Sequence, residues 1–260
     1  MVPKKEKPSN YRAPAVQKAF ELLRIVAESR QELGLSAIAK SLGFSKSTTH
    51  GLIQALLDIG ALDQNPQRKR FFLGPAVVEL AFRSWNYLRV VEHAQPLLDE
   101  LRDQIGETVF LGALSRSRGL IMATAEATKP LKISSPPGTT IPLLAGAVGK
   151  VFLAQQENQQ IVQLLDDHGL PRFTDHSIVT SEDYLAELER VRQQGYALDK
   201  EEYLPGVRAV AVALGNHRGL PLAVWVVGFA DSMNDRLLPG VVRATLDTAR
   251  KLQVGLENGS

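Results

Sequence analysis

Cysteine is absent from all 260 residues of the chain, and this absence excludes several kinds of site. Without thiols the protein cannot form a disulfide framework, a thiolate zinc site, an iron–sulfur cluster or a cysteine nucleophile. Long apolar runs are absent as well, since no window reaches the roughly 18 consecutive apolar residues that a membrane span needs. The start, MVPKKEKPSNYR, is basic and polar with no apolar stretch behind it, so no secretion signal is visible and we expect a cytoplasmic protein.

Charge is distributed unevenly along the chain, although the formal net charge is only +2. Residues 1–75 hold twelve Lys and Arg against six Asp and Glu, which gives +6, and residues 76–260 hold eighteen against twenty-two, which gives −4. This asymmetry is expected when one end of a protein approaches a polyanion and the other end does not. A merely uneven surface is the alternative, and the sequence pattern has to distinguish the two.

The N-terminal part of the chain shows three helical patterns. Residues 1–12 lack apolar periodicity and are predicted to form a flexible basic arm. Apolar residues at helical spacing predict a helix from Ala15 to near Arg30. Ser36 is expected to cap a short second helix, and Ser45 to cap a third helix at 46–59 whose first turns are crowded with polar side chains.

After these helices the spacing of apolar residues changes from the helical period to a strand-like pattern, which predicts a β-hairpin. The apolar residues 61–62 and 71–73 are predicted to form its two strands. The polar loop Asp63–Arg70 between them carries a basic tip. Three helices and a basic hairpin over residues 13–75 form a winged helix-turn-helix, which inserts its second motif helix into the DNA major groove and lays its wing along phosphates or the minor groove. A helical hairpin that only packs on a neighbour is the alternative. The predicted DNA-binding residues are Ser36, Ser45, Lys46, Ser47, Thr48, Thr49, His50, Arg68, Lys69 and Arg70.

Beyond the wing, the chain is predicted to continue as a linker helix and a second domain. An amphipathic helix runs from Pro75 to about Gln95, and Pro96 is expected to start or kink another that reaches Ile105. We assign 76–90 to the linker, whose Trp and Leu residues favour contact with a second copy of the chain. The domain at 91–260 mixes both element types, with strands expected at 108–114, 120–127, 196–199, 207–214 and 222–229, and helices at 147–155, 159–167, 184–194 and 240–256.

The segment AGAVGKV at 145–151 superficially suggests nucleotide binding. A phosphate-binding P-loop needs a glycine where Leu144 stands and a Ser or Thr where Val151 stands, so we reject that function. Small residues at the start of a helix do allow a ligand to approach backbone N–H groups. They also permit close packing of a helix on a sheet, and both interpretations stay open.

Signals for catalysis are weak. Asp199, Glu201 and Glu202 could bind a metal ion or act as an acid/base pair, but a solvated loop in which one of them orients the neighbouring backbone is favoured. The five histidines show no HExxH spacing, and no G-x-S-x-G nucleophile motif is present. The sequence therefore predicts no catalytic residue, no metal site and no cofactor.

In combination, four segments resemble the IclR-type family of bacterial transcriptional regulators along nearly the whole chain. These are LSAIAKSLGFSKSTTHGLIQALLDIGAL, FFLGP, PLLAGAVGKVFLA and QQGYALDKEEYLPGVRAVAV, in that order. The resemblance implies an α+β protein with an N-terminal winged helix-turn-helix, a dimerising linker helix and a GAF-like effector-binding domain whose antiparallel sheet is flanked by helices. It also implies homodimers, or dimers of dimers that form homotetramers, on double-stranded operator DNA.

The resemblance also implies an effector pocket. Its expected contacts in this chain are Leu111, Met122, Gly146, Ala147, Asp199, Ala209, Trp225 and Val227. Family members that bind small organic acids tend to carry Ser or Cys at the last three positions, where this chain has Ala, Trp and Val. Without these hydrogen-bond donors, the carboxylate of a bound small acid would lose its water with few replacement partners. We therefore expect an aromatic or apolar effector rather than a small 2-oxo acid. The alternative is a pocket that Trp225 fills completely.

One position of the predicted recognition helix departs from the family. Gly51 stands where family members commonly carry Arg, which removes a cation that could reach phosphate and costs about 1 kcal/mol of helix propensity.

The sequence as a whole predicts a ligand-responsive repressor or activator, acting on a catabolic pathway. An enzyme with an N-terminal interaction module is the alternative, and a protein-binding function of the helical N-terminus is a third possibility.

Overall fold

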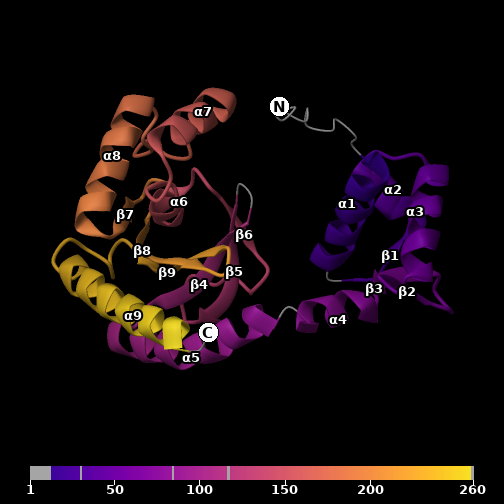
Figure 1. Ribbon diagram of the computed structural model, residues 1–260, viewed down its shortest axis with the longest axis horizontal. Coiled ribbons are helices and arrows are strands. Elements are labelled where there is room, and N and C mark those ends of the chain that lie inside the picture. The colour runs from indigo at the N-terminus through magenta and orange to yellow at the C-terminus, as the bar shows by residue number, and fades with distance from the viewer. Residues whose placement is uncertain (1–12, 30, 84, 116–117, 259–260) are drawn as a thin grey trace, which may run out of the picture. The chain divides into compact units, whose positions relative to one another are not determined.

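Two compact units make up the chain, Met1–Tyr87 and Leu88–Ser260, and each is described by itself. The computed structural model describes residues 13–258 except Arg30, Ser84 and residues 116–117 (Figure 1). The predicted basic arm, 1–12, lies outside the described residues. The domain boundaries at 13–75, 76–90 and 91–260 remain predictions, although the linker helix of the sequence analysis is divided here between two helices.

The described residues of the first unit form four helices and a small antiparallel sheet. The helices are α1 (Pro14–Glu28), α2 (Leu35–Leu42), α3 (Lys46–Asp58) and α4 (Pro75–Arg83), and the strands are β1 (Leu33–Gly34), β2 (Leu62–Asn65) and β3 (Arg70–Leu73). The sheet order is β1-β3-β2, so the hairpin β2–β3 is joined by a short strand that precedes α2. The core lies between α1, α2, α3 and the hairpin and includes Leu22, Ile38, Ile53, Leu56 and Phe71. This is the predicted winged helix-turn-helix.

Local sequence signals explain where these helices begin and end. Ser45 caps α3 as expected, because its side chain accepts the N–H of Thr48. Gly43 ends α2 with a left-handed φ of 66°, a conformation that costs glycine little. The expected cap at Ser36 is wrong. The N-cap of α2 is Gly34, so Ser36 lies within the first helical turn, because the short strand β1 delivers the chain into the helix two residues earlier.

The second unit is a six-stranded antiparallel sheet between two layers of helices. Its strands are β4 (Thr108–Ser115), β5 (Arg118–Ala125), β6 (Thr140–Pro142), β7 (Ala197–Lys200), β8 (Val207–His217) and β9 (Leu220–Phe229). Its helices are α5 (Trp85–Ile105), α6 (Gly146–Leu153), α7 (Asn158–His168), α8 (Ser181–Gln194) and α9 (Leu238–Asn258). The sheet order is β6-β5-β4-β9-β8-β7, and β9, apolar on both faces, is central as predicted. Figure 1 shows α5 and α9 on one side of the sheet and α6, α7 and α8 on the other.

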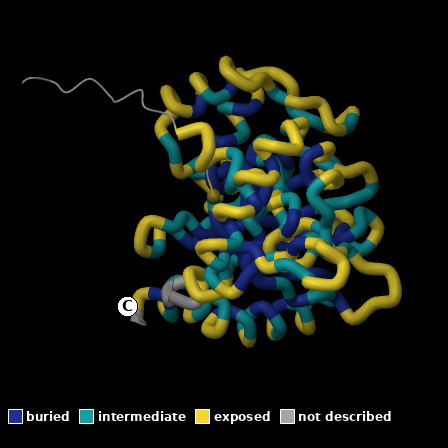
Figure 2. Tube along the Cα trace, turned by 90° about the vertical axis from the view of Figure 1, so that its right-hand side faces the viewer, coloured by how far each residue is buried: buried dark blue, intermediate teal, exposed yellow. Residues whose placement is uncertain are grey.

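Burial follows from this layered arrangement. Figure 2 shows buried positions gathered in the interior, with exposed positions along the outer turns. Phe110, Phe152, Leu188 and Trp225 belong to one buried cluster between the sheet and the layer of α6, α7 and α8. The candidate pocket described below opens within this cluster.

No new helix starts at Pro96, which was one of the two outcomes expected there. A single helix, α5, runs from Trp85 through Pro96 to Ile105; α4 ends at Arg83, and Ser84 between them is not described. Pro96 cannot donate a hydrogen bond to the carbonyl of Glu92. Both residues are exposed, so water can satisfy that carbonyl and the helix continues. The short strands β1 and β6 were not expected from the sequence, because two or three residues show no periodicity.

Candidate functional site

The start of α3 presents a cluster of exposed hydroxyl groups. The Oγ atom of Ser45 accepts the backbone N–H of Thr48 at 3.1 Å and lies 3.0 Å from the Oγ of Ser47 and 2.9 Å from the Oγ1 of Thr48. Lys46 and His50 are also exposed on these first turns. The cluster thus provides donors, acceptors and one cation on a helix end that is open to solvent.

Thr49 does not belong to this exposed cluster. Its side chain is fully buried and its Oγ1 donates to the carbonyl oxygen of Ser45 at 3.0 Å. Thr49 shares the inner face of α3 with Ile53 and Leu56, four and seven residues further along the helix. The predicted DNA contact at Thr49 is therefore wrong, because the residue stabilises the helix against the core instead. Ser36 is exposed but lies on α2.

The β2–β3 hairpin carries the predicted basic tip. Asn65 organises the turn, since its Oδ1 accepts the N–H groups of residues 67 and 68 and its Nδ2 donates to the carboxylate of Glu32. Arg68, Lys69 and Arg70 are all exposed. Arg70 also donates to the carbonyl oxygen of Glu32 at 3.1 Å, so its guanidinium is held against the body of the unit.

A cavity of about 210 Å³ opens in the second unit beside β9 and the start of α6. Its lining includes six of the eight predicted effector contacts, namely Gly146, Ala147, Asp199, Ala209, Trp225 and Val227. The structure therefore brings together residues that are up to 81 positions apart in the sequence (Gly146 to Val227). Figure 1 shows how the strands and α6 converge in this region.

Leu111 and Met122, which the sequence analysis predicted as effector contacts, do not line this cavity. Their chain neighbours Phe110 and Ile121 line it instead. Successive side chains of a strand point to opposite faces of the sheet, so an error of one residue reverses the face. Leu111 and Met122 are buried nonetheless.

Trp225 forms an aromatic wall of the cavity rather than filling it. Its ring stacks on that of Phe110, with centroids 5.5 Å apart and planes 26° from parallel. Gly112 on the neighbouring strand makes room for this ring, because a Cβ there would approach the indole to 2.6 Å. The indole is therefore held at the cavity edge, which argues against the alternative of a completely filled pocket.

Asp199 is the charged side chain of the cavity lining and is only 6 % exposed. Its Oδ1 accepts the backbone N–H of Glu202 at 2.6 Å. Burial raises the pKa of the Asp199 carboxyl to about 6, against a smaller opposing effect of that hydrogen bond. Gly146, at a left-handed φ of 60°, lies directly against the other carboxylate oxygen, where a Cβ would collide with it.

The carboxylates next to Asp199 have structural partners. Glu202 accepts from the Nζ of Lys150 at 2.7 Å, and that buried ammonium also donates to Glu187 and to the carbonyl oxygen of Leu198. Glu201 instead accepts the N–H of residue 206 at 3.1 Å. Within the described residues, no three His, Asp or Glu side chains are grouped in a way that could hold a metal ion. The favoured interpretation, in which one acid orients the loop backbone, is the one that Asp199 fits.

Several lining residues were missed by the sequence analysis. These are Phe110, Ile121, Ile133, Ser135, Thr139, Thr140, Ile141, Ala145, Val148, Tyr203, Leu204 and Val207. Most lie in loops or short elements without periodicity. Tyr203 could have been suspected, because it follows the acidic run directly in the sequence. In the structure its ring packs edge-on against that of Phe173, with centroids 5.0 Å apart.

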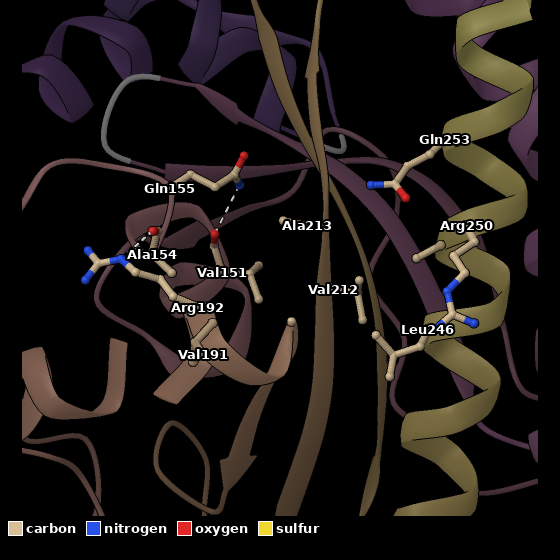
Figure 3. A pocket seen from close by; sticks show the side chains of 12 residues that line it. Val151, Ala154, Gln155, Val191, Arg192, Val212, Ala213, Leu246, Arg250 and Gln253 are labelled. Atoms are coloured by element: carbon tan, nitrogen blue, oxygen red, sulfur yellow. Dashed lines mark hydrogen bonds between the residues drawn. The ribbon is translucent and has the colours of Figure 1, made fainter. Parts of the chain in front are cut away.

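A second, larger cavity of about 450 Å³ lies where α6, α8, β8 and α9 meet. Figure 3 shows Val212 and Ala213 of β8 between the helices, with Leu246 and Arg250 projecting from α9. Arg192 is occupied, since its Nε donates to the carbonyl oxygen of Ala154 at 2.8 Å. None of the predicted effector contacts lines this cavity.

Comparison with known proteins identifies the family. The family model described as "Bacterial transcriptional regulator IclR C-terminal" matches residues 83–254, and that described as "IclR helix-turn-helix domain" matches residues 15–66. The chain belongs to the IclR family of bacterial transcriptional regulators. IclR-family members combine a DNA-binding helix-turn-helix domain with an effector-binding domain, and the two units described above carry these two matches. No helix in the described part of this IclR-family chain is both long and apolar enough to span a membrane.

Individual relatives support the assignment to the IclR family. The transcriptional regulator XynR of Escherichia coli (strain K12) is 33% identical over 209 residues, which cover 80% of this chain and 83% of XynR. An IclR regulator from Alicyclobacillus acidocaldarius has a solved structure that matches with a TM-score of 0.79 and 27% identity, over 94% of this chain and 99% of that chain.

A more distant IclR homolog shares the fold. This protein, from Microbacterium hydrocarbonoxydans, was solved in complex with 4-hydroxybenzoate. It matches with a TM-score of 0.80 and 18% identity over 94% of this chain and 99% of that chain. The similarity confirms the α+β architecture predicted from the sequence.

Proposed function

We propose that this chain is a sequence-specific transcriptional regulator whose operator binding is controlled by a single-ring or similarly compact apolar effector. The observation that carries the proposal is the pairing, in one IclR-family chain, of an exposed polar and basic helix end with a buried ligand-sized cavity. Occupancy of the cavity by the effector then controls DNA binding. Neither unit requires a catalytic residue for this function.

In this proposal α3 reads the DNA major groove. Ser47, Thr48 and His50 are placed to meet base edges, and Lys46 to meet a phosphate or a base edge. Arg68 and Lys69 at the tip of the hairpin then lie along the phosphate backbone. Arg70 contributes less, because it is already bonded to the carbonyl of Glu32. Ser45 acts indirectly, by fixing the hydroxyl cluster.

The size and lining of the smaller cavity favour an aromatic or apolar effector. An engineered cavity of roughly 150 Å³ lined by apolar side chains holds one benzene molecule, so about 210 Å³ suits one substituted ring. The stacked Phe110 and Trp225 rings offer a flat surface for it. The homolog solved with 4-hydroxybenzoate supports the idea that this fold accepts a molecule of that size.

The proposed mechanism is a shift between two arrangements of the DNA-binding units in a homodimer or dimer of dimers. The effector must bind one arrangement more tightly than the other, since a ligand of equal affinity for both shifts nothing. Half-sites one helical turn apart, or a multiple of it, would be read by two copies of α3. Palindromic or repeated operators are the expected targets.

Selection of genomic fragments on the full-length protein tests the DNA-binding part. We expect enrichment of one or a few intergenic palindromes, with anisotropy titrations showing affinity that falls steeply as salt rises. Binding that is weak and indifferent to sequence, with or without candidate effectors, would contradict the proposal. An enzyme with an interaction module, the alternative from the sequence, predicts no such enrichment.

The effector part is tested separately with the recovered operator. Single-ring compounds are titrated into the protein–operator complex. The same titration is made with the Trp225→Phe variant, which keeps a ring but loses the larger indole surface. We expect some of these compounds to change operator affinity and the variant to change their potency. A small 2-oxo acid that acts alone, while no ring compound acts, would contradict the aromatic effector.

A further inference from the structure

The larger cavity, of about 450 Å³, lies at an open edge of the sheet and shares no lining residue with the proposed effector cavity. Strand β7 pairs with β8 only as far as the pair Ala197–Ala211, whereas β8 continues to His217. In the described part of the sheet, no strand therefore covers that side of Val212 and Ala213. The cavity lies in this place, between α6 and α8 on one side and α9 on the other (Figure 3).

The deep part of this cavity is apolar. Four of its lining residues, one from each surrounding element, are at most 5 % exposed: Val151, Val191, Val212 and Ala249. The half-buried residues Ala154, Ala213 and Leu246 complete the apolar lining. An engineered apolar cavity of roughly 150 Å³ holds one benzene molecule, so about 450 Å³ accommodates an apolar body larger than one ring. The inner part of a ligand must be apolar here, because burial of an unpaired polar group is costly.

The rim of the cavity is polar and positively charged. The described residues that line the cavity include Arg192 and Arg250 but no Asp or Glu. Arg192 already donates four hydrogen bonds within the protein, so its guanidinium is occupied. Arg250 donates from its Nη1 to Asp247 at 2.8 Å, and this ion pair is exposed and therefore weak. The other N–H groups of the Arg250 guanidinium have no partner among the described residues and can bind a ligand.

Gln253 provides a second polar group beside Arg250. It lies three residues further along α9, and Figure 3 shows its amide extending toward β8. The residue is half-buried, and within the described part of the chain its side-chain amide has no hydrogen-bond partner. Residues three apart on a helix are neighbours on its surface, so one carboxylate at the rim can accept from both side chains. An alkylammonium group would meet only cations and neutral groups there.

We propose that this cavity is a second small-molecule site, which binds an amphipathic carboxylate. An apolar chain or fused ring of about ten carbon atoms lies in the deep part, and the carboxylate lies at the rim beside Arg250 and Gln253. The site is separate from the proposed effector cavity, so the failure of one does not imply the failure of the other.

The test compares three probes that share one chain length and differ in charge. Decanoate, 1-decanol and decylammonium are titrated into the full-length protein by calorimetry at pH 7.5 and low ionic strength. We expect decanoate to bind about two- to fivefold more tightly than 1-decanol, which is the range of an exposed ion pair, and decylammonium to bind more weakly than either. The advantage of decanoate should shrink as salt is added.

Two alanines of β8 locate the bound probe. Ala213 lines this cavity and Ala209 lines the proposed effector cavity, four residues apart on the same face of the strand. Ala213→Leu should weaken decanoate binding by about tenfold or more, because the larger side chain fills the cavity. Ala209→Leu is the matched control and should leave decanoate binding unchanged.

Two arginines of α9 test the role of charge. Arg250→Gln should remove the preference for decanoate over 1-decanol, because it replaces the rim cation by a neutral amide. The matched control is Arg243→Gln, since Arg243 is an exposed arginine of the same helix outside the lining, and it should keep the preference. Arg250 is exposed, so this comparison does not depend on repacking of the core.

Several outcomes would overturn the inference. Equal binding of the three probes would overturn the anionic class of ligand, as would an unchanged preference in Arg250→Gln. Decanoate binding that Ala209→Leu abolishes and Ala213→Leu preserves would place the probe in the effector cavity instead. Absence of binding by all three probes would overturn the site. If Ala213→Leu then also dissociated the oligomer in sedimentation equilibrium, a second copy of the chain would be the occupant of the cavity.

Discussion

The burial of Asp199 makes a quantitative prediction about stability. Its pKa is raised from 3.8 to about 6, mainly by burial, so the folded state holds this proton over a pH range where the unfolded chain has released it. Stability contributed by the site is therefore greatest below pH 4 and falls as the pH rises to about 6. Since each tenfold change in an ionisation constant corresponds to about 1.4 kcal/mol, ionised Asp199 costs the folded second unit about 3 kcal/mol at pH 7.5.

Asp199→Asn removes this cost and keeps the acceptor for the N–H of Glu202. We expect the variant to exceed the parent by about 1–3 kcal/mol in unfolding free energy at pH 7.5, and the gain to shrink as the pH falls from 6 to 4. Urea denaturation across this pH range measures the difference directly. Asp235→Asn is the control, and we expect it to change the unfolding free energy in the opposite direction. Lys200 and Arg208 lower the pKa of Asp235, so loss of this carboxylate should destabilise the protein at neutral pH. A difference for Asp199→Asn that is negative, or the same at every pH, would refute the reasoning.

Four further substitutions test other parts of the account. Gly51→Ala should raise the unfolding free energy of the first unit by about 0.5–1 kcal/mol, because an added Cβ meets no atom within 4 Å; a loss would show a hidden role for the glycine. Ser45→Ala should lower the unfolding free energy of the first unit by about 1 kcal/mol in urea denaturation through loss of the cap, and no change would contradict its role. Lys150→Ala should cost about 3–5 kcal/mol in urea denaturation, because it leaves the half-buried carboxylate of Glu202 without its cation and removes one of the two cations that pair with Glu187, and a neutral result would contradict the ion network. Gly112→Ala should shift the emission of Trp225, since the new Cβ collides with the indole, and an unchanged spectrum would contradict the packing.

Much of the fold was predictable because its signals are local. The cap at Ser45, the change of period after α3 and the two-sided apolar strand β9 each identify an element from a few neighbouring residues. The winged helix-turn-helix follows from the first two of these signals. The inner position of Thr49 was also accessible, because its spacing from Ile53 and Leu56 places all three on one helix face.

The cavity was less predictable because its geometry depends on strand pairing. Every residue of β4 from Thr108 to Ala113 is buried, so the apolar pattern does not show which side chains face α6. The resemblance pointed to Leu111 on β4 and Met122 on β5, whereas the cavity is lined by their chain neighbours Phe110 and Ile121. The role of Lys150 depends on contacts with α8 and with the loop after β7, 37 to 52 residues away.

The central claim is that α3 and the hairpin tip bind DNA. The most direct measurement is the salt dependence of operator affinity for the full-length protein and for Lys46→Ala and Arg68→Ala, with Lys251→Ala on α9 as a charge-matched control. The account predicts that each of the first two variants lowers affinity and reduces the slope of log K against log salt by about 1, whereas the control changes neither. Unchanged affinity and slope in both α3 and hairpin variants, with the operator still bound, would contradict the claim.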